Sequence, residues 1–469
     1  MGTIHPHVFR EYDIRGVVDR DIDTDFAYRL GRAFGTYIRR QRDTVRLAVG
    51  RDCRHSSDVL FDALCRGLQA SGCDVLDIGV VPTPLLYYAL FVLPVQGGVQ
   101  ITASHNPPEF NGFKLCAGKD ALYGTQIQDV RRIMESGDFI DGTGTFTRET
   151  GLVEMYIQHI VDNITMGPRR LRVVIDAGNG TAGPVARALY TRLGCDLTCL
   201  YCDMDGSFPN HHPDPVVPEN LRDLRGRVTD IGADVGIGFD GDADRIGVVD
   251  ERGEIIWGDM LLLIYARDLL RVQRGVPVIF EVKCSMILER EIERLGGIPV
   301  MWKAGHSLIK AKMRELAAPL AGEMSGHMFF ADRYYGYDDA IYAGARLLEI
   351  LSHTERPLSA LVADLPQTVA TPEIRIPCPD DVKFRVVADV TETFRRRGLP
   401  LVDVDGVRVK YPHGWGLVRA SNTQPALVLR FEALSGEELE AIRTDIMRVV
   451  RDALHRHGVE AQSGKRAAD

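Results

Sequence analysis

Two short segments of the sequence combine side chains that could transfer a charged group. Residues 102–114 read Thr-Ala-Ser-His-Asn-Pro-Pro-Glu-Phe-Asn-Gly-Phe-Lys, with a hydroxyl at Ser104, an imidazole at His105 and an ammonium at Lys114. The apolar run 97–101 before them predicts a buried strand, and the Asn-Pro-Pro and Asn-Gly sequences stop regular structure. We therefore expect Ser104 on a rigid turn beyond a strand end, where open α/β sheets place reactive groups. An ordinary polar turn is the alternative.

The second segment places three carboxylates at alternate positions, Asp240, Asp242 and Asp244, directly after the apolar run 233–239. Alternate side chains of an extended chain fall on one side, so these oxygens can converge and favour a hard cation such as Mg²⁺. A calcium loop of the EF-hand type fits less well, because Arg245 stands where that loop needs glycine and the flanking segments are predicted strands. A solvated acidic turn is the other alternative.

Two further segments could hold a ligand. Glu323, Ser325 and His327 alternate with small or apolar residues, which suits a polyhydroxylated ligand, and His327 could also move protons. A second group, with a guanidinium, two hydroxyls and an amide, could surround a phosphate dianion. This group consists of Arg419, Ser421, Asn422 and Thr423. Each segment taken alone is also compatible with a surface turn.

Some single residues could join these segments. Tyr12 and Arg15 lie in a polar stretch near the N-terminus, Lys283 follows a predicted strand, and Lys303 and His306 precede a predicted helix. Each of them, by itself, is typical of a solvated surface group.

The composition of the chain limits the classes of protein to consider. With 469 residues it is too long for one core, so three or four domains are expected, and 45% hydrophobic and 26% charged residues are typical of a soluble globular protein. The net charge of -9 argues against a nucleic-acid partner, and no apolar run is long enough to span a membrane. The nine cysteines are scattered, and the Cys199/Cys202 pair has no second pair to complete a zinc site, so a reducing cytoplasm fits.

The elements that must position these residues alternate between strand and helix. A strand followed by a helix is predicted three times, at 45–50 and 57–68, at 171–176 and 183–193, and at 276–280 with a helix through 292. The pattern predicts an α/β fold of three similar domains with mixed, largely parallel sheets. Strands at 406–410, 416–420 and 426–433 with a final helix at 436–455 predict a C-terminal α+β domain. The predicted boundaries are 1–149, 150–254, 255–366 and 367–458, with a tail at 459–469.

In this order, the four segments resemble the α-D-phosphohexomutase family, and most closely its bacterial phosphomannomutase/phosphoglucomutase branch. The resemblance covers essentially the whole chain, and the serine loop together with the Asp-Gly-Asp-Ala-Asp-Arg loop is highly specific. It implies four domains around a central cleft and reversible transfer of phosphate between the 1- and 6-positions of mannose and glucose phosphates. It further implies a phosphoserine at Ser104, a hexose 1,6-bisphosphate intermediate, Mg²⁺, and glucose 1,6-bisphosphate as activator.

The resemblance also implies roles for the remaining residues. Asp240, Asp242 and Asp244 would hold Mg²⁺ together with a phosphoserine oxygen at Ser104. The sugar hydroxyls would be held by Glu323, Ser325 and His327, and the phosphate that is not transferring by Arg419, Ser421, Asn422 and Thr423. Tyr12, Lys283, Lys303 and His306 complete the predicted substrate-binding set. Lys114 and His327 are the candidates for proton transfer to and from the sugar.

Charge balance agrees with this assignment. A phosphoserine and three carboxylates exceed the charge of one Mg²⁺ by about three negative charges, so the site needs cations. The candidates are Arg15, Lys114, Arg245 and His105. Phosphoryl transfer depends mostly on positioning and charge neutralisation, which this set of residues could provide.

Three alternatives stay open. Phosphoglucosamine mutases are similar but typically carry glutamine where this chain has Met324, and the loop 332–338 departs mildly from the family pattern. Asp240 and Asp242 also have the spacing of an aspartate-nucleophile sugar phosphatase. A sugar-phosphate-binding module without activity could share the fold. The expected partners are small hexose phosphates rather than nucleic acid or membrane, and a cytoplasmic monomer is expected.

Overall fold

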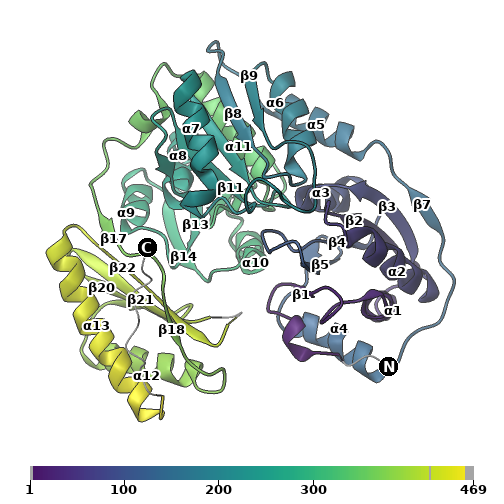
Figure 1. Ribbon diagram of the computed structural model, residues 1–469. Coiled ribbons are helices and arrows are strands. Elements are labelled where there is room, and N and C mark those ends of the chain that lie inside the picture. The colour runs from purple at the N-terminus through teal and green to yellow at the C-terminus, as the bar shows by residue number, and fades with distance from the viewer. Residues whose placement is uncertain (1–3, 422–423, 460–469) are drawn as a thin grey trace.

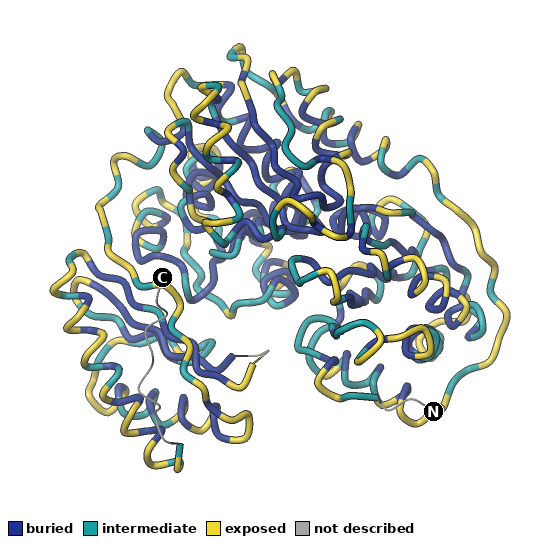
Figure 2. Tube along the Cα trace, viewed as in Figure 1, coloured by how far each residue is buried: buried dark blue, intermediate teal, exposed yellow. Residues whose placement is uncertain are grey.

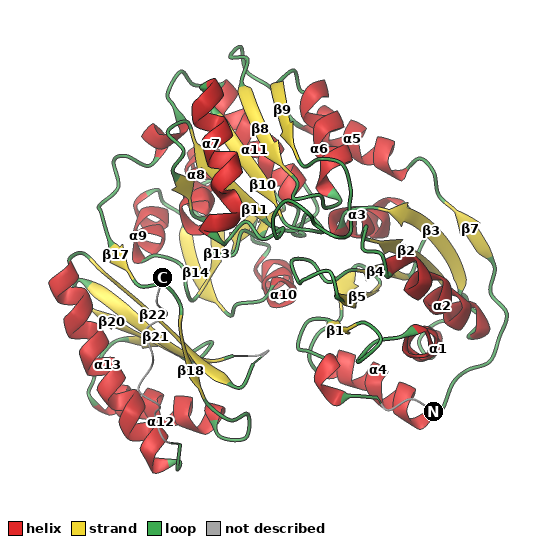
Figure 3. Ribbon diagram, viewed as in Figure 1, coloured by secondary structure: helices red, strands yellow, loops and turns green. Residues whose placement is uncertain are grey.

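The computed structural model describes residues 4–421 and 424–459 and arranges them in four units, each built on its own β-sheet. Figure 1 shows the units in an arc that follows the chain, with the yellow C-terminal unit facing the purple N-terminal one. Figure 3 shows helices packed against all four sheets. Among the described helices, none is both long and apolar enough to cross a membrane.

The first sheet has the strand order β1-β5-β4-β2-β3-β7, with β6 paired to β5. The pairs among β4, β2, β3 and β7 are parallel, whereas β5 runs antiparallel to β1, β4 and β6. The strands are β1 (Ile14–Val17), β2 (Arg46–Arg51), β3 (Asp74–Val80), β4 (Gly97–Ile101), β5 (Phe110–Ala117), β6 (Asp120–Ala121) and β7 (Phe146–Arg148). The helices are α1 (Thr24–Arg39), α2 (Ser57–Ala70), α3 (Thr83–Val92) and α4 (Thr125–Ser136).

The second sheet has the order β12-β11-β10-β8-β9. The β8 strand is parallel to β9 and β10, and β10, β11 and β12 form an antiparallel edge. The strands are β8 (Arg172–Asp176), β9 (Asp196–Leu200), β10 (Val235–Phe239), β11 (Ile246–Asp250) and β12 (Ile255–Ile256). The helices are α5 (Leu152–Asn163), α6 (Ala182–Arg192) and α7 (Arg222–Ile231).

The third sheet has the order β14-β13-β15-β16, with a parallel centre and β16 antiparallel at one edge. The strands are β13 (Pro277–Glu281), β14 (Ile298–Trp302), β15 (Leu320–Gly322) and β16 (Met328–Phe330). The helices are α8 (Gly258–Val272), α9 (Met286–Arg294), α10 (His306–Leu316) and α11 (Ala340–Ser352). The carboxyl ends of these parallel strands lead into loops that carry predicted site residues, as expected for open α/β sheets.

The fourth sheet is antiparallel throughout its described pairs and has the order β17-β22-β21-β20-β19, with β18 also on β22. The strands are β17 (Val369–Ala370), β18 (Ile374–Pro377), β19 (Leu401–Val402), β20 (Val407–Tyr411), β21 (Gly414–Ala420) and β22 (Ala426–Ala433). The helices are α12 (Lys383–Arg396) and α13 (Gly436–Arg456), which pack against each other and against the sheet.

The first three units share one hydrophobic core. Leu86 of α3, Tyr156 of α5, Ile237 of β10 and Leu262 of α8 all belong to a single cluster of buried residues, and Figure 2 shows the buried segments running from one sheet to the next. The fourth unit has a core of its own. A small apolar cluster joins it to the third unit, and its members are Val282, Met286, Ile287, Trp415 and Leu417.

These findings confirm the predicted fold class. Three units have mixed sheets with parallel centres, and the last is an α+β unit with an antiparallel sheet. The strand predicted at 45–50 is β2, and the helix predicted at 436–455 is α13. All nine cysteines are free. The predicted domain boundaries stay a prediction.

Candidate active site

Ser104 lies on the turn that follows β4, as predicted. Its φ of 52° is in the left-handed region, which is costly for a residue with a side chain and must be held by its surroundings. The main-chain N–H of Ser104 donates to the Thr102 hydroxyl at 2.9 Å. Its own hydroxyl donates to Asp240 Oδ2 at 2.6 Å and lies 3.2 Å from His105 Nδ1. The serine loop of the first unit therefore meets the acidic loop of the second.

Arg54, which the sequence analysis did not single out, holds this turn in place. It follows the end of β2, is only 2% exposed, and pairs with Asp52 at 3.1 Å. Its guanidinium donates to four main-chain oxygens of the serine loop at 2.6–3.1 Å, those of Ser104, Asn106, Pro107 and Phe110. Only arginine carries five N–H donors, so its side chain can satisfy several main-chain oxygens of an irregular buried loop at once.

The three carboxylates converge as predicted. Asp240, Asp242 and Asp244 lie on the hairpin turn between β10 and β11, are at most 1% exposed, and offer ligand atoms within 4.8 Å of one another. Strands flank the loop on both sides, which excludes the helix-loop-helix of an EF-hand. Burial, followed by the charges of Asp244 and Asp242, raises the pKa of Asp240 well above its ordinary value.

The donor set fits a divalent cation. Asp242 Oδ1 and Asp244 Oδ1 are buried and accept no hydrogen bond from the described residues. Buried carboxylate oxygens without partners are costly, and a bound cation would satisfy them. The acidic cluster can therefore bind a metal ion.

Two buried cations offset the carboxylates. Lys114 of β5 donates to Asp242 Oδ2 at 2.8 Å and also contacts Asp244 Oδ2. Burial opposes its charge, but Asp242 and Asp244 raise the pKa of Lys114 above its ordinary value. Arg245 lies 3.1 Å from Asp240 and 3.1 Å from Asp214, a buried carboxylate that the sequence analysis missed. Both cations are thus firmly protonated partners of the cluster.

The other two predicted cations behave differently from each other. Arg15 of β1 donates to Asn106 Oδ1 at 2.5 Å and to Asp13 at 2.5 Å, so it borders the serine loop as expected. Burial, together with the charges of Arg245 and Arg15, lowers the pKa of His105 well below its ordinary value. Its Nδ1 lies 3.2 Å from the Ser104 hydroxyl, and its catalytic role stays a prediction.

His327 connects the acidic cluster to the sugar-binding segment. Its Nδ1 lies 3.0 Å from Asp338 and 3.8 Å from Asp244 Oδ1. Burial would lower the pKa of His327, but Asp244 and Asp338 raise it to about 9. Lys310 donates to the other oxygen of Asp338 at 2.8 Å. The sequence analysis did not identify Asp338 and Lys310 as site residues, because no local pattern connects them to His327, which precedes Asp338 by eleven residues.

A cleft of about 240 Å³ opens beside His327 and is lined by three of the four units. The predicted residues that line it are Tyr12, Lys283, His306, Glu323, Ser325, His327, Arg419 and Ser421. Lys303 is exposed and is not among the residues that line the cleft, so its role in substrate binding stays a prediction. Glu373 and Arg375, which were not predicted, do line it. Asn422 and Thr423 lie outside the described residues.

Neighbouring residues hold several of the charged side chains that line the cleft. Arg419 pairs with Asp405 at 2.9 Å, and its buried Nε has no partner among the described residues. Lys283 lies 3.1 Å from Glu373. Glu323 Oε1 accepts the N–H of Gly305, just before α10, at 2.5 Å, and burial raises the pKa of Glu323. The cleft thus offers cations for a phosphate and carboxylates for hydroxyl groups.

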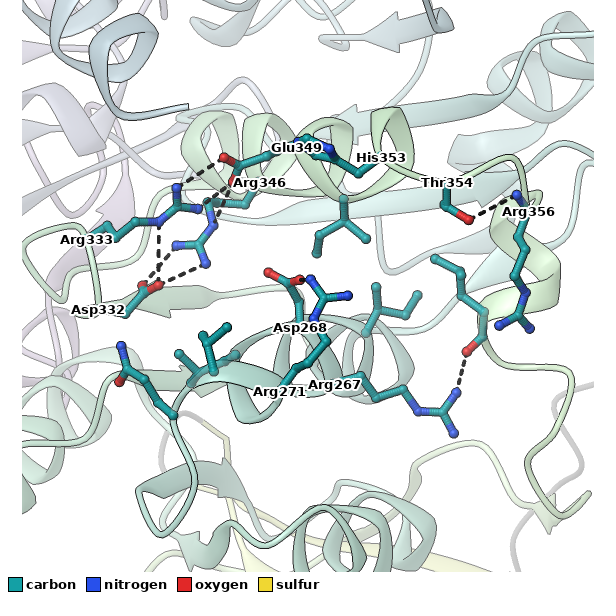
Figure 4. A pocket seen from close by; sticks show the side chains of 16 residues that line it. Arg267, Asp268, Arg271, Asp332, Arg333, Arg346, Glu349, His353, Thr354 and Arg356 are labelled. Carbon is teal, nitrogen blue, oxygen red and sulfur yellow. Dashed lines mark hydrogen bonds and ion pairs between the residues drawn. The ribbon is translucent and has the colours of Figure 1, made fainter. Parts of the chain in front are cut away.

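A larger cavity, of about 690 Å³, lies between α8 and α11 and contains none of the predicted site residues. Figure 4 shows Arg333 and Arg346 bonded to neighbouring carboxylates of the cavity. Arg346 bonds Asp332 at 2.9 Å, Arg271 bonds Asp268 at 2.9 Å, and Arg267 bonds Asp364, outside the lining, at 2.8 Å. These three arginines are therefore already paired with carboxylates, and none of the predicted site residues lines this cavity.

Comparison with known proteins gives one consistent result. Models of the four phosphoglucomutase/phosphomannomutase domains match residues 6–141, 154–253, 257–369 and 373–449. A phosphomannomutase/phosphoglucomutase of Pseudomonas aeruginosa is 48% identical over 94% of this chain and 95% of its own. A phosphoglucomutase of Neisseria gonorrhoeae is 43% identical over 97% and 99%. The crystal structure of a family protein from Burkholderia thailandensis, 44% identical, covers 98% of this chain and 100% of its own with a TM-score of 0.92.

Proposed function

This chain belongs to the phosphoglucomutase/phosphomannomutase family and is a hexose phosphate mutase, and we propose that Ser104 carries the phosphoryl group that it transfers. The observation that supports Ser104 most directly is its 2.6 Å hydrogen bond to Asp240, inside a cluster of three buried carboxylates. A phosphorylated Ser104 would lie beside these carboxylates and their partners Lys114 and Arg245. His327, which is 3.8 Å from Asp244, connects this cluster to the cleft.

The transfer consists of two in-line displacements. In the first, a hydroxyl oxygen of the hexose monophosphate forms a bond to phosphorus while the bond between phosphorus and Ser104 Oγ breaks, which gives a hexose 1,6-bisphosphate. The intermediate then reverses its orientation. In the second displacement, Ser104 Oγ forms a bond to the phosphorus of the other phosphoryl group while the bond between that phosphorus and the sugar oxygen breaks, which gives the isomeric hexose monophosphate and restores the phosphoserine. One carrier and one phosphate-binding segment are sufficient for both steps. Glucose 1,6-bisphosphate would prime an enzyme that has lost its phosphoryl group.

We assign proton transfer to His327. It lines the cleft and lies beside Asp244, so it can reach both the sugar and the acidic cluster. In its protonated form it can donate to a departing sugar oxygen, and in its neutral form it can accept the proton of an attacking hydroxyl. Lys114 is bonded to Asp242 and Asp244 and does not line the cleft, so we assign it to charge stabilisation.

The remaining groups hold the substrate and the metal ion. Arg419, Lys283 and Ser421 would bind the phosphate that is not transferring, and Glu323, Ser325 and Tyr12, which also line the cleft, would bind the sugar. Asp240, Asp242 and Asp244 would hold Mg²⁺, which suits three oxygen ligands. When bound, Mg²⁺ supplies positive charge to the transferring phosphoryl group.

The carrier can be tested with Ser104→Ala and, as a matched control, Ser136→Ala at an exposed position. Ser104→Ala should lose nearly all turnover of glucose 1-phosphate, and intact-mass measurement should show one phosphoryl adduct on the wild type and the control only. An adduct that persists in Ser104→Ala and is cleaved by hydroxylamine would assign the carrier to an aspartate instead, as in a phosphatase.

The preferred sugar needs a separate measurement. Met324 contacts Arg430 and does not line the cleft, so this position does not distinguish glucosamine from mannose or glucose. Coupled assays with mannose, glucose and glucosamine 1-phosphates, primed with glucose 1,6-bisphosphate and Mg²⁺, would rank the three. We expect mannose and glucose 1-phosphates to be turned over faster. Monomeric state and cytoplasmic location stay predictions from the sequence.

A further inference from the structure

Cys199 and Cys202 bring two thiols together at the end of β9, outside the cleft. The thiols are hydrogen-bonded to each other, and that of Cys202 also donates to the main-chain oxygen of Leu200 at 3.4 Å. Between the two cysteines, Tyr201 has a φ of 50°, in the left-handed region, which turns the chain at the strand end. Thiols in contact need only a small movement to reach the length of an S–S bond, about 2 Å.

The surroundings of the two thiols suit oxidation. Of the nine cysteines, all of them in the described part of the chain, only Cys53 and Cys199 are partly exposed, so an oxidant can reach the Cys199 sulfur. Arg187 of α6 is hydrogen-bonded to both sulfurs of the pair and would stabilise negative charge on them. Burial, followed by the charge of Cys199, raises the pKa of Cys202 to about 12. Cys199 is therefore the thiol that reacts first, and Cys202 the one that resolves the product.

The turn that carries the two thiols also supports the loop 177–181, which follows β8. The main-chain N–H of Asn179 donates to the oxygen of Tyr201 at 2.8 Å. That of Ala177 donates to the oxygen of Leu200 at 3.2 Å. A rearrangement of the cysteine turn therefore acts directly on the hydrogen bonds of this loop.

The loop 177–181 in turn supports the acidic cluster. Thr181 donates to the main-chain oxygen of Gly241 with its N–H at 3.0 Å and with its hydroxyl at 3.2 Å. A Cβ atom at Gly180 would lie 2.6 Å from the same oxygen, so the two loops touch through their main chains. Gly241 lies between the first two carboxylates of the cluster. The thiols are thus connected to the metal-binding loop through a single intervening loop.

We propose that Cys199 and Cys202 form a reversible disulfide when the protein meets hydrogen peroxide, and that this bond weakens metal binding at the acidic cluster. In the first step, the Cys199 sulfur forms a bond to one peroxide oxygen while the O–O bond breaks, which gives a sulfenic acid and water. In the second, the Cys202 sulfur forms a bond to the Cys199 sulfur while the S–O bond breaks. The thiol proton leaves with the hydroxyl group as a second water molecule. The two sulfurs are oxidised and the peroxide is reduced.

The disulfide would alter the turn in two ways. Cys202 would lose the proton that it donates to Leu200, and the two sulfurs would move closer together. Both changes act on the carbonyl oxygens that hold the loop 177–181. A dithiol such as dithiothreitol would restore the thiols by exchange.

Counting of free thiols in the full chain tests the bond. After peroxide treatment and denaturation, alkylation should find two free thiols fewer than the nine of the reduced protein, and dithiothreitol should restore them. Cys199→Ser should keep all its thiols, whereas Cys202→Ser should accumulate a sulfenic acid at Cys199 that dimedone traps. Cys53→Ser, which removes the other partly exposed cysteine, is the matched control and should lose two thiols as the wild type does. No loss in the wild type, or a loss of two in Cys199→Ser, would overturn the proposal.

The effect on metal binding rests on the proposed Mg²⁺ site and is measured separately. Titration calorimetry with MgCl₂ should give a dissociation constant roughly tenfold higher for the oxidised than for the reduced wild type, as changes around metal ligands do. Peroxide-treated Cys199→Ser should bind as it does before treatment. A disulfide that left the affinity unchanged would overturn the coupling. Absence of Mg²⁺ binding in the reduced wild type would overturn both the metal site and the coupling, whereas the thiol count decides the disulfide without any metal.

Discussion

The guanidinium of Arg54 donates a hydrogen bond to the main-chain oxygen of Ser104 at 2.9 Å. The same side chain binds three more carbonyl oxygens of the loop. Ser104 has a left-handed backbone, so its position depends on contacts from outside the loop. Arg54 is therefore a positioning residue for the proposed carrier.

Arg54→Met should lower kcat by roughly tenfold to a hundredfold, because small displacements of a reacting group are enough for losses of that size. The KM for glucose 1-phosphate should change little, since Arg54 does not line the cleft. Arg66→Met, at an exposed position of α2, is the control and should keep wild-type kinetics. If Arg54→Met raised KM and left kcat unchanged, a positioning role would be wrong.

Asp242→Asn should weaken Mg²⁺ binding by roughly tenfold or more, because it removes one of three charged ligands. The amide can still accept hydrogen bonds from Thr83 and Lys114, which now bind Asp242 Oδ2, so the fold should persist. Titration calorimetry with MgCl₂ measures the loss, and the rate as a function of Mg²⁺ should shift in parallel. Asp230→Asn, at an exposed position, should bind Mg²⁺ as the wild type does. Unchanged affinity in Asp242→Asn would exclude the acidic cluster as the metal site.

Arg419→Ala should raise the KM for glucose 1-phosphate by roughly tenfold to a hundredfold, as expected for loss of a charge-assisted phosphate contact. Its Nε has no partner among the described residues, so it is available for a ligand. Steady-state kinetics beside Arg443→Ala, an exposed control on α13, measure the effect. A variant that lost only kcat would argue against a binding role for Arg419.

Asp339 should make the stability of the protein depend on pH. It caps α11, accepts hydrogen bonds from Tyr156 and Tyr334, and has its pKa raised from 3.8 to about 6 by burial. The folded state thus retains a proton that the unfolded chain releases, so this contribution is complete below pH 3.8 and is lost as the pH rises through 6. The loss amounts to about 3 kcal/mol.

Asp339→Asn should remove that dependence. Between pH 4 and pH 7, the unfolding free energy of the variant should therefore rise by about 2 kcal/mol relative to wild type. Urea unfolding at the two pH values measures this difference, with Asp196→Asn as an exposed control. The same pH dependence in Asp339→Asn and wild type would show that the group titrates normally.

The parts of the site that lie within one loop could be predicted from the sequence. Ser104, the three carboxylates and His327 follow strand ends, and a local pattern of apolar run, turn residues and polar groups is sufficient to locate them. The fold class could be predicted from the alternation of strands and helices along the chain. The structure then brings the loops together as the resemblance implied.

Residues that act across units could not be predicted in this way. Arg54 and Asp214 reach the site from turns without a distinctive pattern, and Lys310 acts only through Asp338. Their roles depend on which sheets become neighbours, and a single sequence does not encode that locally. Just before α10, Lys303 is exposed whereas His306 lines the cleft, a difference that the sequence pattern does not show.

The fourth unit contacts the third through the small apolar cluster that contains Trp415. Ser104 and Asp240 belong to units that share one continuous core, whereas Arg419 belongs to a unit with a core of its own. A movement of the fourth unit at this apolar cluster would displace Arg419 in the cleft without changing the contact between Ser104 and Asp240. The proposed phosphate-binding residue Arg419 and the proposed carrier Ser104 therefore belong to parts of the molecule that are packed separately.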